Sequence, residues 1–160
     1  MKSNFIIFTL LIAMLTGCAT PLGTGKAPLS GIQSRLAALS KAKYDVSLIM
    51  EVPSANNAIS NQIMVASIQA GADATAVVDL VAILKGPNAK PIAVLGDNDA
   101  VTAATIEAAL KRLQGFKPSA KLYFVGETSY GQALKAQADA AGVNFEAVSA
   151  DSTLKCNFCK

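Results

Sequence analysis

Two short apolar runs, residues 91–95 and 121–125, constrain the fold of this chain most strongly. Each run ends at a glycine and is followed by a long segment with apolar residues at helical spacing. The two units also resemble each other at a spacing of 30 residues, because Val-Leu-Gly-Asp at 94–97 aligns with Phe-Val-Gly-Glu at 124–127. Continuous apolar strands that alternate with helices are typical of parallel sheets buried on both faces. The pattern therefore predicts an α/β fold.

The other segments continue the alternation of strands and helices. With right-handed crossovers, this order predicts a three-layer sandwich with a mainly parallel sheet, Rossmann-like or doubly wound, in a single domain over 30–150. Segment 73–85 has an apolar helical face but is rich enough in β-branched residues to form a strand instead. The other expected elements are helices over 30–43, 54–69, 99–114 and 128–141, and strands over 44–52, 91–95, 121–125 and 143–147.

Several details of these elements are also predicted. We expect Ser30, Asp99 and either Thr128 or Ser129 to cap the helices that they begin. The first helix is expected to bury an apolar stripe, and the strand over 44–52 is expected to place its apolar residues on one side. The stripe comprises Ile32, Leu36 and Leu39, and the strand's apolar side comprises Tyr44, Val46, Leu48, Met50 and Val52.

The ends of the two buried strands are where a ligand site is expected, because open α/β sheets bind ligands beyond the carboxyl ends of their strands. Three carboxylates there, with amide and hydroxyl oxygens, suit a hard cation such as Ca²⁺ or a small ligand. The alternative is that these residues only form turns and cap helices. No glycine pattern here matches a dinucleotide or P-loop motif. The candidate ligand-binding residues are Asp97, Asn98, Asp99, Glu127, Thr128 and Ser129.

The absence of histidine from the chain restricts its chemistry. A Ser-His-Asp triad, a Cys-His pair and histidine metal ligands are all excluded. The one Ser-x-x-Lys match, at 152–155, lies in the tail, and Asp97 and Asp99 are too close in sequence to indicate an acid–base pair across a cleft. We therefore predict a protein that is not an enzyme and that has no catalytic residue, cofactor or resident metal.

The first 17 residues have the parts of a signal peptide. Lys2 is followed by an apolar segment over 5–15 and by the small residues Thr16 and Gly17. An apolar segment of this length is shorter than the roughly 20 residues that a membrane-spanning helix needs. With Cys18, the sequence Leu-Thr-Gly-Cys resembles the lipobox of bacterial lipoproteins. The resemblance implies that Cys18 is acylated and becomes the first residue of the mature protein.

Residues 18–29 are predicted to be a lipidated flexible tether, because glycine and proline interrupt the segment repeatedly. Two or three acyl chains on one cysteine anchor a protein durably. In the lipoprotein family the residue after the cysteine affects sorting, and Ala19 is not the aspartate linked to retention in the inner membrane. The resemblance therefore implies a location at the periplasmic face of the outer membrane.

The tail over 151–160 contains a C-x-x-C motif formed by Cys156 and Cys159. In an oxidising compartment a local disulfide between them is expected. An intermolecular disulfide, a redox site and half of a zinc site are the alternatives. A redox cysteine favours a helix amino terminus, and only Lys160 follows Cys159. Zinc would need further ligands from carboxylates or from a partner.

A second resemblance covers residues 104–148, which are similar to OmpA-like peptidoglycan-binding domains. The shared order is helix, strand, Gly-x-Thr turn, helix, Gly-Val and strand. The residues at 126–129 stand where that family has Gly-His-Thr-Asp, so its ligand-binding aspartate falls at Ser129. No arginine follows Arg112 to supply the family's binding arginine. The resemblance implies a scaffold that lacks both binding residues.

Charge and location together indicate the class of partner. The formal net charge is only +3, and the basic residues form no stripe of the kind that binds nucleic acid. We expect a membrane-anchored periplasmic lipoprotein that acts as an accessory or assembly component of a cell-envelope complex, with envelope proteins as partners. The alternatives are a small-ligand or Ca²⁺-binding module and a degenerate peptidoglycan-associated protein. The sequence does not predict an oligomeric state.

Overall fold

We analysed the fold in a computed structural model, which describes residues 31–150. The predicted signal peptide over 1–17, the lipidated Cys18 and the tether over 18–29 lie outside the described residues. The predicted disulfide between Cys156 and Cys159 lies outside them as well.

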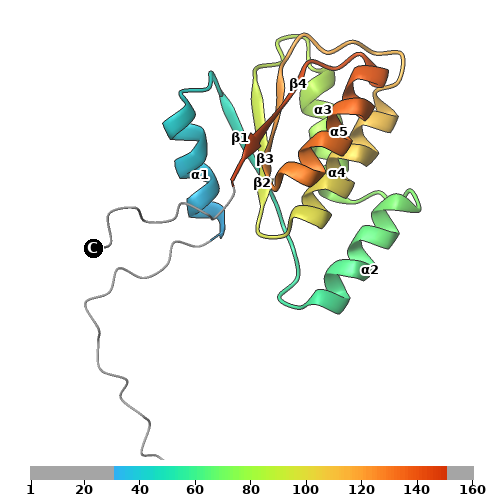
Figure 1. Cartoon of the computed structure of the whole chain (residues 1–160). Helices are drawn as coiled ribbons and strands as arrows, with labels where there is room; N and C mark the ends of the chain where they lie inside the picture. The colour runs from blue at the N-terminus through green and yellow to red at the C-terminus, as the bar shows by residue number, and fades with distance from the viewer. Residues whose placement is uncertain (1–30, 151–160) are drawn as a thin grey trace, which may run out of the picture.

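Four parallel strands form one sheet in the order β1-β2-β3-β4, which is also their order in the chain (Figure 1). The strands are β1 (Leu48–Val52), β2 (Ile92–Gly96), β3 (Leu122–Gly126) and β4 (Phe145–Ser149). The predicted α/β fold with a parallel sheet is confirmed. Because the described strand order never reverses, this sheet has no switch-point crevice of the doubly wound kind.

Helices cover both faces of the sheet and complete a three-layer sandwich. Right-handed crossovers that always step in the same direction leave their helices on one face. Accordingly α3, α4 and α5 lie together on one face, and α1, which precedes β1, covers the other (Figure 1). The helices are α1 (Gly31–Ala42), α2 (Ala58–Gln69), α3 (Thr75–Lys85), α4 (Asp99–Arg112) and α5 (Thr128–Ala141).

The two central strands, β2 and β3, are buried along their whole length, as their continuous apolar sequences predict. Their alternate side chains enter different cores. Val94 and Phe124 belong to the larger core beneath α3, α4 and α5. Leu95 and Val125 belong to the smaller core beneath α1, which Leu39 closes from the helix side.

The rotation of α1 differs from the prediction. Its buried residues are Arg35 and Leu39, whereas Leu36 is 37% exposed. The predicted stripe is therefore wrong at Leu36. Ile32, Arg35 and Leu39 share the inner face instead, because an ion pair of Arg35 with a residue of α4 fixes how the helix turns toward the sheet.

The strand predicted over 44–52 begins only at Leu48 and does not keep one apolar side. Val46 packs into the core beneath α1, whereas Met50 packs into the larger core on the opposite face. The reason lies in the backbone: Ser47 and Leu48 both donate their N–H groups to the carbonyl oxygen of Pro91, at 3.0 and 3.1 Å. Two consecutive donors on one acceptor break the alternation of a strand, as in a β-bulge.

The start of α2, the caps of α4 and α5, and the start of one strand also differ from the prediction. α2 begins at Ala58 rather than at residue 54, because the preceding segment forms a loop. Asn98, not Asp99, caps α4 by accepting the N–H of Val101 at 3.1 Å. Neither Thr128 nor Ser129 caps α5, which has Glu127 at its N-cap position without a side-chain cap bond. β4 starts at Phe145, since Val143 still donates its N–H to Ala138 at the end of α5.

The sequence of segment 73–85 allowed either a helix or a strand, and the segment forms the helix α3. Its buried residues are Val77, Leu80 and Leu84. Across residues 31–150, no helix has both the length and the apolar character needed to cross a membrane.

Candidate functional site

The carboxyl edge of the sheet brings the two predicted turns together. Residues 97–99 follow β2 and residues 127–129 follow β3, and these two strands are paired neighbours. The helices α4 and α5 begin directly after the turns. The predicted site residues are therefore in one region, and what they can do depends on how they pair.

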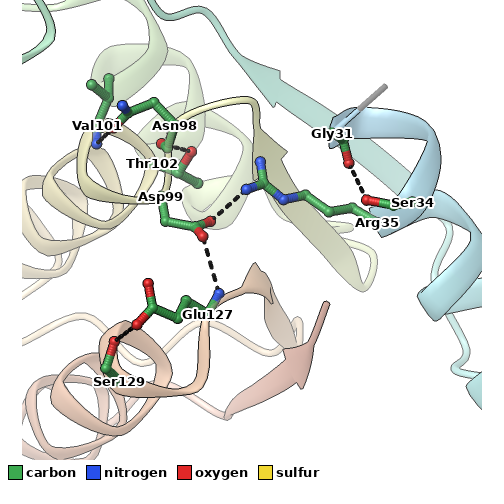
Figure 2. Close-up of polar contacts among 9 residues, drawn as sticks. All are labelled: Gly31, Ser34, Arg35, Asn98, Asp99, Val101, Thr102, Glu127 and Ser129. Atoms are coloured by element: carbon green, nitrogen blue, oxygen red, sulfur yellow. Dashed lines mark hydrogen bonds and ion pairs between the residues drawn. The ribbon is translucent and has the colours of Figure 1, made fainter. Parts of the chain in front are cut away.

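A single carboxylate, that of Asp99, connects three helices in this region (Figure 2). Its Oδ1 lies 2.8 Å from Nη2 of Arg35 on α1, and its Oδ2 accepts the backbone N–H of Glu127 at 3.2 Å. The side chains of Arg35 and Asp99 are 9% and 20% exposed. We call these three residues the Arg35 network. An ion pair so far removed from water depends on both partners.

The glycines that end β2 and β3 make room for side chains of α4. A Cβ on Gly126 would collide with Oδ1 of Asp99 and with the ring of Phe124. A Cβ on Gly96 would lie 2.6 Å from both Oγ1 of Thr102 and the carbonyl oxygen of Val52. The repeated glycine in the sequence thus serves helix packing and the approach of Asp99. It gives no evidence of phosphate binding.

Most of the other predicted site residues bond to neighbours. The side chain of Asn98 caps α4, and its carbonyl oxygen accepts from the hydroxyl of Thr102 at 2.9 Å. The hydroxyl of Thr128 contacts that of Ser149 at 3.3 Å. The hydroxyl of Ser129 donates to the carboxylate of Glu127 at 2.8 Å. These contacts fit the alternative in which the residues form turns and hold helix ends.

The carboxylates of this edge do not converge on one point. Asp99 is turned toward Arg35, whereas the carboxylate of Glu127 is turned toward Ser129. In the described part of the chain, no group of three or more Asp, Glu, Cys or His residues is placed to hold a metal ion. The geometry therefore gives no support to the Ca²⁺ hypothesis.

Asp97 and Asn98 line a polar cleft of about 550 Å³ between the ends of β1 and β2. The opposite wall is the loop over 53–57, which Asn61 holds by accepting the N–H of Ala55 at 2.7 Å and donating to its carbonyl oxygen at 3.0 Å. Glu51 adds a second carboxylate. This cleft, rather than the Arg35 network, is the part of the predicted site that is open to a ligand.

Arg35 was not among the predicted site residues. It is 8% exposed, and its Nη1 is buried without a hydrogen-bond partner among residues 31–150. A signal was present, because Arg35 stands three residues after Ile32 and four before Leu39, on the apolar face of an amphipathic helix. An arginine at such a position needs a buried anion, and Asp99 supplies it.

A second polar cluster closes the core beneath α1 at the other end of the sheet. Lys121 and Glu146 form an ion pair, and the Lys121 Nζ lies 5.0 Å from the centre of the Tyr123 ring. The hydrogen bond from Lys121 lowers the pKa of Glu146, and the same bond raises the pKa of Lys121. A hydrogen bond to Glu146 raises the pKa of Tyr44, whose ring lies 5.2 Å from that of Tyr123.

The surface of α2 differs from that of the other helices. No residue from 52 to 72 carries a charge. The helix is attached through Asn61, Met64, Val65 and Ile68 and packs against α4, at the carboxyl end of the sheet (Figure 1). Its opposite side is exposed, with Ile59 at 72% and Ile63 at 61%. We call this side the α2 outer face, which comprises Ile59, Ile63, Ala66 and Ala70.

Comparison of the chain with protein-family models, with curated proteins and with solved structures found no match.

Proposed function

We propose that this protein is an interaction component of a cell-envelope complex, held at the periplasmic face of the outer membrane through an acylated Cys18 and acting without catalysis. The observation that carries the proposal is the α2 outer face. Its two isoleucines are more than half exposed and one helical turn apart. Burying one such side chain fully contributes about 1.5–3 kcal/mol, so leaving both in water is costly unless a partner covers them.

The surroundings of these isoleucines suit a protein partner. The cores of protein interfaces are depleted of charged residues, and residues 52–72, which include the whole of α2, carry none. Residues 59, 63, 66 and 70 also follow the four-three-four spacing by which one helix packs along another. The exposed face thus has the composition and the period of a helix that is completed by a partner.

The carboxyl edge of the sheet supports a role without catalysis. Apart from Asp97, the residues expected there engage one another or cap a helix, which suits a structural role in holding the turns and helix ends. The Arg35 network then has a mechanical role: it fixes α1, the helix that follows the predicted tether, to the rest of the domain.

Crosslinking in intact cells followed by affinity capture and mass spectrometry tests this proposal. The captured protein is compared with an Ile59→Ser/Ile63→Ser variant, and Leu36→Ser serves as the control because it removes an exposed apolar residue from α1. We expect one envelope protein to be captured with the natural chain and with the control but not with the α2 variant. Equal capture by all three would contradict the proposal. The same samples report acylation of Cys18 and the oxidation state of Cys156 and Cys159.

The polar cleft favours a second candidate function, the binding of a small polar ligand. Glu51 and Asp97 supply negative charge there, and asparagine side chains supply amide groups. This set suits a small molecule with an ammonium group. A thermal-shift screen with primary amines and amino sugars tests it. Stabilisation that is lost in Asp97→Ala supports ligand binding, and no stabilisation by any of these compounds excludes that ligand class.

A further inference from the structure

The outer edge of β1 is unpaired in the described part of the chain. Among residues 31–150, β1 pairs with β2 alone, and none of these residues pairs with the backbone groups of its other edge. Helix α1 packs over β2, β3 and β4, which leaves the α1 side of β1 uncovered and Ile49 57% exposed. An open edge of this kind is a template on which another strand can pair.

A groove runs along this edge, between β1 and α3. Its volume is about 680 Å³, and its walls are mainly apolar, including Leu48, Met50 and Ile83. We call it the β1–α3 groove.

The charges of the β1–α3 groove are all negative. Glu51 and Asp79 are the charged residues that line it. The basic residue at the end of α3, Lys85, lies instead 6.0 Å from the centre of the Phe116 ring. A second copy of the chain, paired edge to edge through β1, would bring two such acidic pairs together without a compensating cation. The charge therefore argues against self-association at this edge and in favour of a basic partner.

We propose that the β1–α3 groove binds, by addition of a strand to β1, an extended segment of a partner protein in which apolar and basic residues alternate. Backbone hydrogen bonds to the β1 edge supply affinity, and the side chains supply specificity. Because alternate side chains of a strand point to opposite faces, one set enters the apolar groove against Leu48 and Met50. The other set lies on the face of β1 that carries Ile49 and Glu51, and Glu51, which also borders the groove, is the carboxylate that its basic side chains would meet.

This inference rests on the proposed function as an interaction component but uses a different surface from the α2 outer face. Its test is peptide binding by the full chain, produced with its leader and purified in detergent. The probe is a fluorescent seven-residue peptide in which lysine and valine alternate. The matched control peptide has glutamate in place of lysine, and a third peptide carries N-methyl groups on alternate residues, which removes the N–H donors of one edge.

The natural chain is expected to bind the lysine peptide at least about tenfold more tightly than the glutamate peptide, since each cross-strand charge pair changes affinity several-fold. The N-methylated peptide should bind with at least about tenfold loss, because its backbone pairs poorly. Glu51→Lys/Asp79→Lys should reverse the preference between the two charged peptides. A gained affinity for the glutamate peptide also shows that the variant is folded.

Three results would overturn the inference: no preference for the lysine peptide, equal binding of the N-methylated peptide, or an unchanged preference in the charge-reversed variant. Ile59→Ser/Ile63→Ser should leave peptide binding intact. Loss of peptide preference with continued capture through α2 therefore contradicts only the groove. Loss of capture with continued peptide preference contradicts only the α2 interface.

Discussion

Nη2 of Arg35 lies 2.8 Å from Oδ1 of Asp99, and the same carboxylate also accepts the backbone N–H of Glu127. One side chain at the start of α4 therefore binds both the helix on the opposite face of the sheet and the turn before α5. The partners are unequal, because Nη1 of Arg35 is buried and has no partner within the described part of the chain. Because of this difference, removing Asp99 and removing Arg35 should lower the free energy of unfolding by different amounts.

Removing Asp99 should cost more stability than removing Arg35. Asp99→Ala leaves a guanidinium buried without its anion, for which we expect a loss of about 3 kcal/mol in the free energy of unfolding. Arg35→Met removes the charge together with the unpaired Nη1 and keeps an apolar stem, so we expect a loss of about 1 kcal/mol. Urea unfolding of both single variants and the double variant measures this. A larger loss of unfolding free energy for Arg35→Met than for Asp99→Ala would contradict this account of the Arg35 network.

The ion pair of Lys121 with Glu146 should make stability depend on pH on the acid side. Because the folded state lowers the pKa of Glu146, its contribution is present above the unfolded pKa of about 4.3 and is lost as the pH falls through the folded value. The difference in unfolding free energy between the natural chain and Glu146→Gln should therefore shrink from neutral pH toward pH 2. A difference that stays constant over this range would contradict the assignment.

The contact of α5 with β4 can be tested by adding a methyl group on the helix and removing one from the strand. A Cβ on Gly131 would lie 2.6 Å from the Cβ of Ala147. Gly131→Ala should lower the free energy of unfolding by about 1–3 kcal/mol through overpacking. Adding Ala147→Gly should restore part of this loss, although glycine in a strand has its own cost. If the two losses simply add, the helix and strand are not in the contact described.

The α2 outer face should tolerate polar residues without loss of stability. Ile63→Ser changes a side chain that is 61% exposed, so we expect the free energy of unfolding to stay within about 0.5 kcal/mol. Ile68→Ser, on the inner side of the same helix, is the matched control and should cost several times more, because Ile68 is buried. Thermal unfolding compares them. An equal cost at both positions would mean that Ile63 is part of the core.

The sequence predicts the buried strands better than it predicts strand order or the ends of the edge strand. The buried strands β2 and β3 are evident because both of their faces are apolar, and the helices that follow them have clear periods. Strand order is not predictable from these patterns, so the absence of a reversal in the described sheet was not foreseen. β1 was misjudged at residues 44–47 because the double hydrogen bond to Pro91 depends on a segment more than 40 residues away.

The candidate site shows the same limit at the level of side chains. Asp97 and Asp99 have similar local sequences, yet one lines a cleft and the other pairs with Arg35. Their different roles arise from α1: the position of Arg35 on its apolar face indicates a buried anion, but no local pattern tells which aspartate supplies it. The α2 outer face was missed for a related reason: the apolar residues of α2 are spread around the helix and gather on no single side, so the sequence gives no periodic signal of which side is exposed.

The central claim, that the α2 outer face contacts a partner in the cell envelope, is tested most directly by a photo-crosslinking amino acid placed at position 63. The matched control carries it at position 136, an exposed residue of α5. We predict that irradiation of intact cells yields one discrete crosslinked product to an envelope protein from position 63 and none from position 136. Products that are absent from both positions, or identical at both, would contradict the claim.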